Sequence, residues 1–220
     1  MTGGRPESPA GLAECLEVRP IVPGQWLARF AVPWALAGLR PGQLVHLGPE
    51  GIPSAVLRRA WPAAGVDPRE GTLTLYLDDG AEAGWADDWP ARLRTGDRIA
   101  LAGPFGRPFE VDPRSRHLLL VGIGRLSGAL RYLIDAALQE GRNVVLLLGV
   151  PDARAVFPSS LLPDAVEYVV ATADGSLGRQ GTAVDLLPEF EAWADQAFAA
   201  GPLPALAALA RLAAGRRERL

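Results

Sequence analysis

Four stretches of the sequence combine residue types that could bind a nucleotide. The first, LLLVGIGRLSG (residues 118–128), has the pattern of a buried strand, a glycine turn and the start of a helix. Gly122 and Gly124 allow the backbone to approach a ligand closely, and the N–H groups of a helix N-terminus suit a phosphate. The G-x-G-x-x-G spacing is incomplete, because Ser127 stands where the third glycine would be. The stretch therefore suits either a dinucleotide-binding loop or a plain strand-to-helix turn.

A second candidate, TADGSLGRQG (residues 172–181), follows an expected strand and is tight and polar. Asp174 and Gly175 favour a turn, and the hydroxyls of Thr172 and Ser176 could hydrogen-bond a ribose or a phosphate. Arg179 could pair with a phosphate. The same residues also suit an ordinary surface loop.

The third stretch, LRRAWP (residues 57–62), places two arginines beside an aromatic ring. Arginine pairs bidentately with phosphate and tryptophan stacks on flat rings, so Arg59 and Trp61 suit a flavin nucleotide. A strand end with solvated arginines explains the pattern equally well. The fourth stretch, LAGPFGRPF (residues 101–109), contains two prolines and is interpreted as a rigid turn between domains.

Strands and helices must position these stretches, and the composition changes near residue 112. Over residues 1–112, short apolar runs are separated by proline and glycine turns, which predicts an antiparallel barrel or sandwich. We expect a short helix or a loop at 84–93, and strands at 12–19, 25–32, 43–48, 54–59, 72–77 and 98–102.

Residues 113–220 alternate strand and helix patterns, which predicts an α/β domain with a parallel sheet and helices on both faces. Ligands of such sheets bind beyond the carboxyl ends of the strands, where the first two loops lie. Strands are expected at 117–121, 143–148, 166–171 and 196–199. Helices are expected at 127–139 and 204–216, and in part over 183–187 and 190–193.

Composition narrows the function classes. The formal net charge is −3 and no basic run stands out, so nucleic-acid binding is not expected. No apolar run reaches membrane-spanning length and the N-terminus lacks a signal pattern, so we expect a cytoplasmic protein that does not contact membranes. With Cys15 as its single cysteine, the chain is not expected to hold a metal or to build an iron–sulfur cluster.

Taken in order, the stretches resemble the ferredoxin reductase superfamily, and within it the electron-transfer subunits of dihydroorotate dehydrogenase. Residues 103–109 are similar to the family's G-P-L-G-x-x-F stretch, and residues 172–181 match its T-x-D-G-S-x-G-x-x-G loop. Gly201-Pro202 falls where the family has C-G-P.

The resemblance implies a barrel that binds FAD near Arg59, Trp61 and Gly80. It implies an α/β domain that binds NAD(P)H near Gly122, Gly124, Thr172, Asp174, Gly175, Gly201 and Pro202. It also implies a hetero-oligomer with a dihydroorotate dehydrogenase catalytic subunit. Electrons would pass to that partner from NAD(P)H through FAD, in pyrimidine biosynthesis. No side chain is assigned a catalytic role, because the cofactors carry such chemistry and the protein orients them.

The chain departs from the family pattern at both nucleotide sites. Pro62 replaces the hydroxyl residue of the flavin motif, and the loop at 80–84 contains no hydroxyl. Ile123 and Leu126 replace two glycines of the turn. Two further functions therefore stay open. One is a catalytically degenerate reductase-fold subunit that binds and stabilises a partner enzyme. The other is a flavin-binding sensor that does not use NADH.

Overall fold

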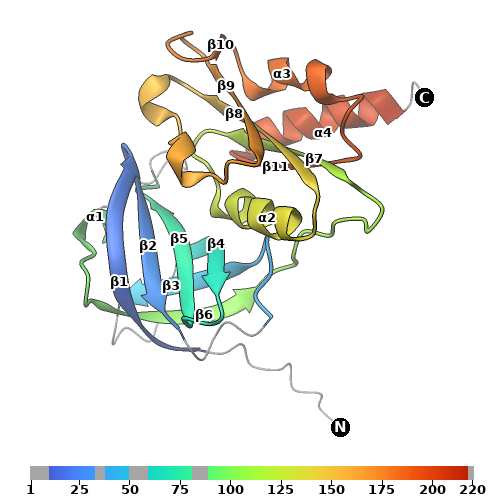
Figure 1. The fold of residues 1–220 in the computed structure, drawn as a ribbon. Coiled ribbons are helices and arrows are strands. Elements are labelled where there is room, and N and C mark those ends of the chain that lie inside the picture. The colour runs from blue at the N-terminus through green and yellow to red at the C-terminus, as the bar shows by residue number, and fades with distance from the viewer. Residues whose placement is uncertain (1–9, 33–37, 50–58, 81–88, 218–220) are drawn as a thin grey trace.

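The computed structural model describes residues 10–32, 38–49, 59–80 and 89–217, which form a β-barrel joined to an α/β unit (Figure 1). The barrel closes in the order β1-β2-β5-β4-β3-β6, and its pairs are antiparallel. Its strands are β1 (Ala10–Val22), β2 (Gln25–Ala31), β3 (Leu44–Pro49), β4 (Arg59–Asp67), β5 (Thr72–Asp78) and β6 (Arg98–Phe105). The short helix α1 (Trp89–Arg92) lies between β5 and β6 in the chain.

Successive side chains of β4 and β5 point to opposite faces of the barrel wall, so this wall contributes to two hydrophobic cores. Leu75 and Leu77 of β5 pack inside the barrel with Trp61 of β4. Tyr76 and Ala64, the neighbours on the opposite faces of these strands, pack instead with residues of the α/β unit. The barrel is therefore joined to the second unit by the outer face of its own wall.

The α/β unit contains a five-stranded sheet in the order β10-β9-β8-β7-β11, and its pairs are parallel. The strands are β7 (His117–Ile123), β8 (Asn143–Val150), β9 (Val166–Thr172), β10 (Arg179–Gln180) and β11 (Gln196–Ala200). The helices are α2 (Gly128–Gln139), α3 (Ala183–Phe190) and α4 (Leu203–Arg217). The expected barrel and the expected parallel α/β sheet are both confirmed.

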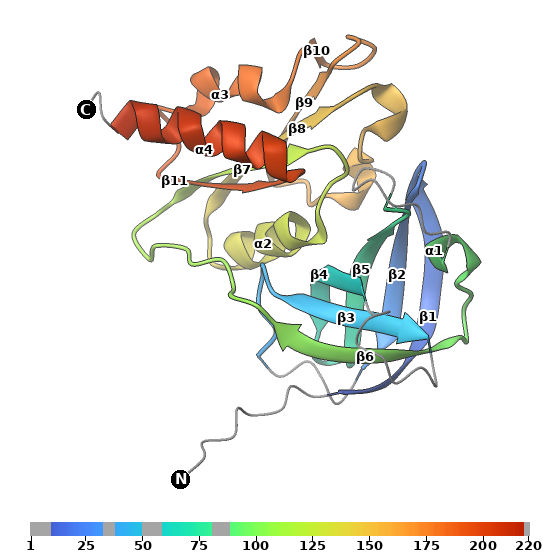
Figure 2. The same cartoon turned by 180° about the vertical axis from the view of Figure 1, so that it is seen from behind.

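The helices cover opposite faces of the sheet (Figure 2). Leu130 and Ile134 of α2 pack with Leu118 and Leu120 of β7, whereas Leu119 and Val121 of that strand pack with α3 and with Leu209 of α4. β8 is buried over seven of its eight residues, as a central parallel strand must be. Within the described part of the chain, none of the helices has the length and apolar character needed to span a bilayer.

The structure differs from the expectations at three elements. The strand expected at 54–59 lies mostly outside the described residues, and β4 begins at Arg59 and continues to Asp67. Pairing with β3 and packing against α2 extend this strand through Pro62, which sits opposite Leu44. A helix was expected over 190–193, but α3 ends at Phe190. The two-residue strand β10 was not expected. The domain boundary at 112–113 falls in the connection between β6 and β7 and stays a prediction.

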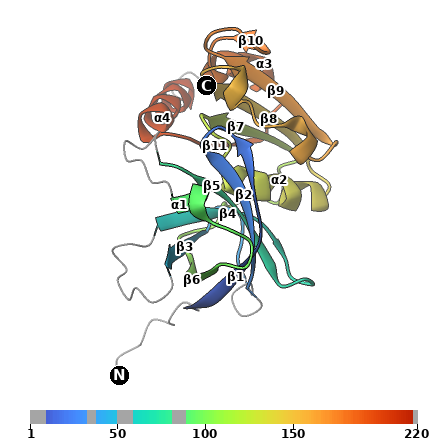
Figure 3. The same cartoon turned by 90° about the vertical axis from the view of Figure 1, so that its left-hand side faces the viewer.

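The two units meet where α2 crosses β4 (Figures 1 and 3). Gly128, the first residue of α2, allows this approach, because a Cβ there would lie 2.7 Å from the carbonyl oxygen of Pro62. The hydroxyl of Tyr132 donates to the carbonyl of Leu39 at 2.9 Å. The barrel and the start of α2 are thus held in direct contact.

Candidate functional site

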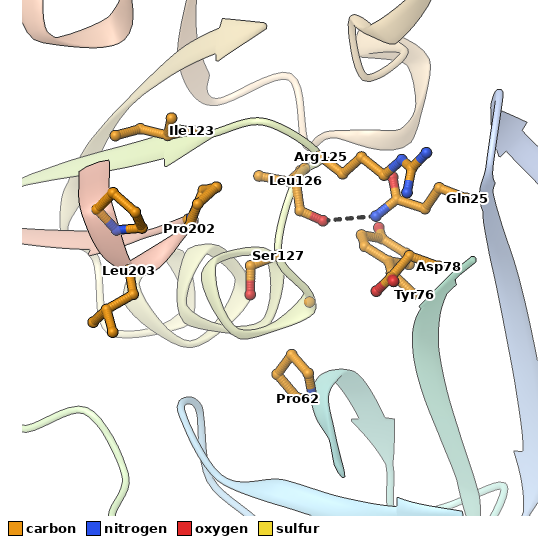
Figure 4. Close-up of a pocket in the computed structure, with 13 residues that line it drawn as sticks. Gln25, Pro62, Tyr76, Asp78, Ile123, Arg125, Leu126, Ser127, Pro202 and Leu203 are labelled. Atoms are coloured by element: carbon orange, nitrogen blue, oxygen red, sulfur yellow. Dashed lines mark hydrogen bonds between the residues drawn. The ribbon is translucent and has the colours of Figure 1, made fainter. Parts of the chain in front are cut away.

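An interdomain cavity of about 530 Å³ lies between the barrel and the α/β unit (Figure 4). The barrel contributes side chains from β2, β4 and β5, and the α/β unit contributes the β7–α2 turn and the start of α4. The lining residues are Gln25, Pro62, Tyr76, Asp78, Ile123, Arg125, Leu126, Ser127, Gly128, Gly201, Pro202, Leu203 and Pro204.

The β7–α2 turn is held in place from both sides of this cavity. Ser127 caps α2, and its hydroxyl accepts a hydrogen bond from the N–H of Ala129 at 3.3 Å. From the barrel, the Nε2 of Gln25 donates to the carbonyl of Leu126 at 3.0 Å. Gln25 is 3% exposed, and its Oε1 is a buried atom without a hydrogen-bond partner in the structure as described. The turn is therefore fixed to the barrel by a contact that spans 101 residues of chain.

Two arginines beside the cavity are engaged by consecutive aspartates at the end of β5. Arg59 donates from Nη1 to the carbonyl of Asp78 at 2.9 Å and from Nη2 to its Oδ1 at 3.2 Å. Arg125 donates from Nη1 to Oδ1 of Asp79 at 2.7 Å. Because Arg125 comes from the β7–α2 turn, the second pair bridges the two units. A Cβ at Gly24 would lie 2.2 Å from Nη2 of Arg125, so the β1–β2 turn also closes on this pair.

Trp61 does not present its ring to the interdomain cavity. The side chain lies in the barrel core and is 2% exposed, and the guanidinium carbon of Arg59 lies 4.1 Å from its ring centroid. The stacking surface expected for a flavin is therefore already covered by Arg59. The indole Nε1 is buried without a hydrogen-bond partner in the described part of the structure. The other predicted flavin-side residue, Gly80, has φ +73° and donates its N–H to Oδ1 of Asp78 at 2.8 Å. Residues 81–84, the rest of that expected loop, lie outside the described residues.

A second space, the edge cavity, of about 590 Å³, lies at the carboxyl edge of the sheet. It is bounded by the ends of β7 and β8, by the start of α3 and by one side of α4. Small residues dominate its walls, which leaves room for a flat ligand. The lining residues are Ile123, Gly124, Gly149, Val150, Pro151, Ala173, Gly181, Thr182, Ala183, Val184, Pro202, Ala205 and Ala208.

The glycines of the first motif have different roles at this edge. Gly124 lines the edge cavity with φ +77°, and its N–H donates to the carbonyl of Gly149 at 2.8 Å. Gly122 lies two residues earlier, inside β7, where a Cβ would come 2.9 Å from Cδ1 of Leu148. Gly122 therefore serves sheet packing, whereas Gly124 borders the space beyond the sheet.

The loop at 172–181 bonds several of its polar groups to itself, although residues 173–180 are exposed. Thr172 is 0% exposed, and its hydroxyl donates to the carbonyl of Leu177 at 2.8 Å and accepts from the N–H of Leu177 at 3.1 Å. Asp174 accepts from the hydroxyl of Ser176 at 2.6 Å and from its N–H at 2.9 Å, and these bonds lower the pKa of Asp174. Gly175 provides the turn with φ +73°.

The expected ribose and phosphate contacts of this loop are thus taken by the loop itself. The hydroxyl of Thr172 is buried and bonded to Leu177, and Asp174 holds its own turn. Arg179 pairs with Glu189 of α3. From this loop and its end, Ala173 and Gly181 reach the edge cavity.

The two cavities adjoin at Ile123 and Pro202, which line both of them. Gly201 lets this junction close, since a Cβ there would lie 2.8 Å from the Cβ of Ile123. Gly201 and Pro202, predicted from the sequence, therefore sit at the meeting point of the two cavities. Ile123 lines both cavities with its side chain.

Sequence reasoning did not single out Gln25 and Tyr76. Tyr76 lines the interdomain cavity and its ring packs against Phe157, with the centroids 5.3 Å apart. Burial raises the pKa of Tyr76 to about 12, so the phenol is neutral at physiological pH. No local motif marks either residue, because each acquires its place through contacts with the other unit.

No family model matches the chain. The chain is 31% identical over 179 residues to the "Dihydroorotate dehydrogenase B (NAD(+)), electron transfer subunit" of Geobacillus thermodenitrificans (strain NG80-2), which covers 80% of this chain and 68% of that protein. It is 32% identical over 174 residues to the protein of the same name from Bacillus caldolyticus, covering 78% of this chain and 66% of the relative. The chain thus spans about two thirds of the length of these relatives.

Solved structures show the same fold. The ferredoxin reductase in carbazole 1,9a-dioxygenase superposes with a TM-score of 0.77 at 24% identity, covering 94% of this chain and 65% of that one. An NADH-dependent reduced ferredoxin-NADP oxidoreductase gives a TM-score of 0.69 at 22% identity, covering 91% and 70%. The barrel and the sheet have the fold of these solved reductases, and the two sequence relatives are 31% and 32% identical to the chain. The chain therefore belongs to the family of dihydroorotate dehydrogenase B electron transfer subunits.

Proposed function

We propose that this chain passes electrons from NAD(P)H through FAD to a dihydroorotate dehydrogenase catalytic subunit, in a cytoplasmic hetero-oligomer that serves pyrimidine biosynthesis. The observation that carries the proposal is the pair of cavities that adjoin at Ile123 and Pro202. Hydride transfer requires the reacting atoms of two ligands to come within about 3–3.5 Å of each other. Two cavities that adjoin at Ile123 and Pro202 place their ligands next to each other, and these two side chains decide whether the reacting atoms can meet.

The residues of the interdomain cavity fit a flavin. Its volume of about 530 Å³ lies within the range of about 300–1,000 Å³ that is typical of ligand pockets. Pro62, Tyr76 and Pro202 offer apolar surfaces to a flat ring. Arg125 in the lining, and Arg59 behind the lining residue Asp78, carry guanidinium groups of the kind that hold phosphates. A bound flavin supplies hydride acceptance and onward electron transfer, while these residues hold and orient it.

The residues of the edge cavity fit the nicotinamide end of NAD(P)H. Gly124, Gly149 and Gly181 have no side chains to fill the space, and Ala205 and Ala208 of α4 cover it. The cavity opens beyond the carboxyl ends of β7 and β8, where ligands of parallel sheets bind. In this arrangement Ile123 and Pro202 exclude water from the junction and set how closely the two rings approach.

A second candidate function is favoured by one specific observation. Arg59 and Arg125 are both engaged by carboxylates of the chain itself, at 3.2 Å to Asp78 and 2.7 Å to Asp79. A subunit that keeps the reductase shape only to bind and stabilise its partner needs no cofactor. Engagement of both arginines by the chain itself would not impair that function.

The visible absorption spectrum tests the two candidates. The purified full chain is incubated with excess FAD, desalted and then treated with NADH. Electron transfer predicts flavin bands that NADH bleaches. Bands that NADH leaves unchanged would contradict electron transfer and support a flavin-binding sensor, and a colourless protein would support the cofactor-free subunit.

A further inference from the structure

Asp78 and Asp79 form a consecutive acidic pair at the end of β5, and each member holds an arginine from a different direction. Arg59 reaches Asp78 from β4 within the barrel, and Arg125 reaches Asp79 from the α/β unit. Both arginine side chains are 16% exposed, and those of Asp78 and Asp79 are 36% and 29% exposed. Partial burial strengthens such pairs relative to pairs in open solvent.

The acidic pair offers the two arginines an anionic partner similar to a diphosphate. A guanidinium group binds a carboxylate and a phosphate through the same planar arrangement of N–H donors. Two adjacent carboxylates present two negative charges on neighbouring groups, as two linked phosphates do. Asp78 and Arg125 line the interdomain cavity itself, so the pair lies where the charged part of a flavin nucleotide would meet the protein.

We propose that Asp78 and Asp79 act as an internal substitute for a diphosphate and thereby determine which flavins the interdomain cavity binds. This inference rests on the proposed binding of a flavin in that cavity. The flavin ring carries no phosphate and therefore does not compete with the two carboxylates for the arginines. The diphosphate of FAD must displace the carboxylates from Arg59 and Arg125 or meet their negative charge. The wild-type chain therefore gains little affinity from the diphosphate.

The Arg125–Asp79 pair adds a consequence for the contact between the units. Because it joins the β7–α2 turn to the end of β5, a phosphate that replaced Asp79 would keep Arg125 at the barrel through the ligand instead. Free and bound states would then share the same interdomain contact. Replacement of Asp79 therefore gives the clearer test of the proposal. Asp78 is less suitable, because its carboxylate also accepts a hydrogen bond from the N–H of Gly80 at 2.8 Å.

The experiment measures the dissociation constants of riboflavin, FMN and FAD for the full chain by quenching of flavin fluorescence. The main variant is Asp79→Asn, which removes one charge and keeps the shape, and Asp78→Asn is the second variant. The matched control is Asp135→Asn, which makes the same charge change in the Arg131–Asp135 pair on α2, outside the lining of the interdomain cavity. Thermal unfolding of each variant shows that it is folded.

We expect Asp79→Asn to bind FAD about tenfold more tightly than the wild type, since like charges no longer face each other, and to bind riboflavin with unchanged affinity. Inorganic pyrophosphate should compete with FAD, and not with riboflavin, in this variant. Unchanged or weaker FAD binding in both aspartate variants, or an equal gain with Asp135→Asn, overturns the inference. Riboflavin binding in those same samples would leave the proposed flavin site standing. If no flavin binds to any of the proteins, the proposed function fails together with the inference.

Discussion

Replacement of Gly128 by alanine tests how the two units are joined. Gly128 begins α2 at the point where the helix crosses β4. A Cβ at this position would lie 2.7 Å from the carbonyl oxygen of Pro62, 3.1 Å from the Cβ of Ala64 and 3.2 Å from the backbone nitrogen of Ala64. The nearest of these atoms belongs to the backbone of a barrel strand, so it cannot rotate away. The added methyl group must push α2 and the β7–α2 turn away from the barrel.

Two effects of opposite sign decide how much Gly128→Ala changes the free energy of unfolding. Alanine is preferred to glycine in a helix by up to about 1 kcal/mol, and by less in the first turn. Overpacking of a well-packed contact costs about 1–3 kcal/mol. We therefore expect Gly128→Ala to lower the free energy of unfolding by about 1–2 kcal/mol. Separation of α2 from β4 should also weaken flavin binding, because Gly128 and Pro62 both line the interdomain cavity.

The assay is urea unfolding followed by tryptophan fluorescence, with Gly65→Ala as the matched control. Gly65 lies on the same strand, β4, and a Cβ there would meet no atom within 4 Å. Gly65→Ala should therefore be as stable as the wild type or slightly more stable. If Gly128→Ala proves as stable as Gly65→Ala, close contact at α2 does not hold the units together and the reasoning is refuted.

Three further predictions follow from individual side chains. Cys15 is buried and burial raises the pKa of its thiol to about 11, so iodoacetamide at neutral pH should modify it only after unfolding; mass spectrometry of native protein that shows rapid modification would contradict this. Burial raises the pKa of Tyr76 from 10.0 to about 12, so its contribution to stability is fully present below pH 10.0 and is lost as the pH rises towards about 12. In alkaline unfolding, Tyr76→Phe should therefore lose less stability over this pH range than the wild type, and equal losses of stability would contradict the prediction. Ile123→Ala should thin the wall between the two cavities and speed the bleaching of bound flavin by NADH in stopped-flow traces, whereas Val184→Ala, at another wall of the edge cavity, should not; equal rates in the two variants would argue against a separating role for Ile123.

Elements whose signals are local could be predicted well. Apolar residues at helical spacing predicted a helix at 127–139, and α2 spans Gly128–Gln139 with Ser127 as its cap. β8 was marked by an apolar run of strand length, and it is the buried centre of the sheet. In both cases the interactions that define the element lie within a few residues of chain. Local chemistry therefore suffices to place them.

Elements and side chains that depend on distant partners could not be predicted in the same way. β4 continues through Pro62 because β3 pairs with it and α2 packs on it. Trp61 and Thr172 have side chains suited to a ligand, yet both are buried in the protein's own packing. Gln25 carries no motif and becomes part of the site through a bond to Leu126.

By itself, the sequence determined the two kinds of architecture, most of the strands and helices, and the glycine and proline positions at the carboxyl edge of the sheet. Periodicity and backbone freedom are properties of neighbouring residues, so they can be read along the chain. Only the tertiary structure decided that Ile123 lines both cavities and that Asp78 and Asp79 hold the arginines beside one of them. Those contacts join segments of chain from different strands and from both units. Whether a polar group faces a ligand or another side chain depends on which distant groups the fold brings within hydrogen-bond range.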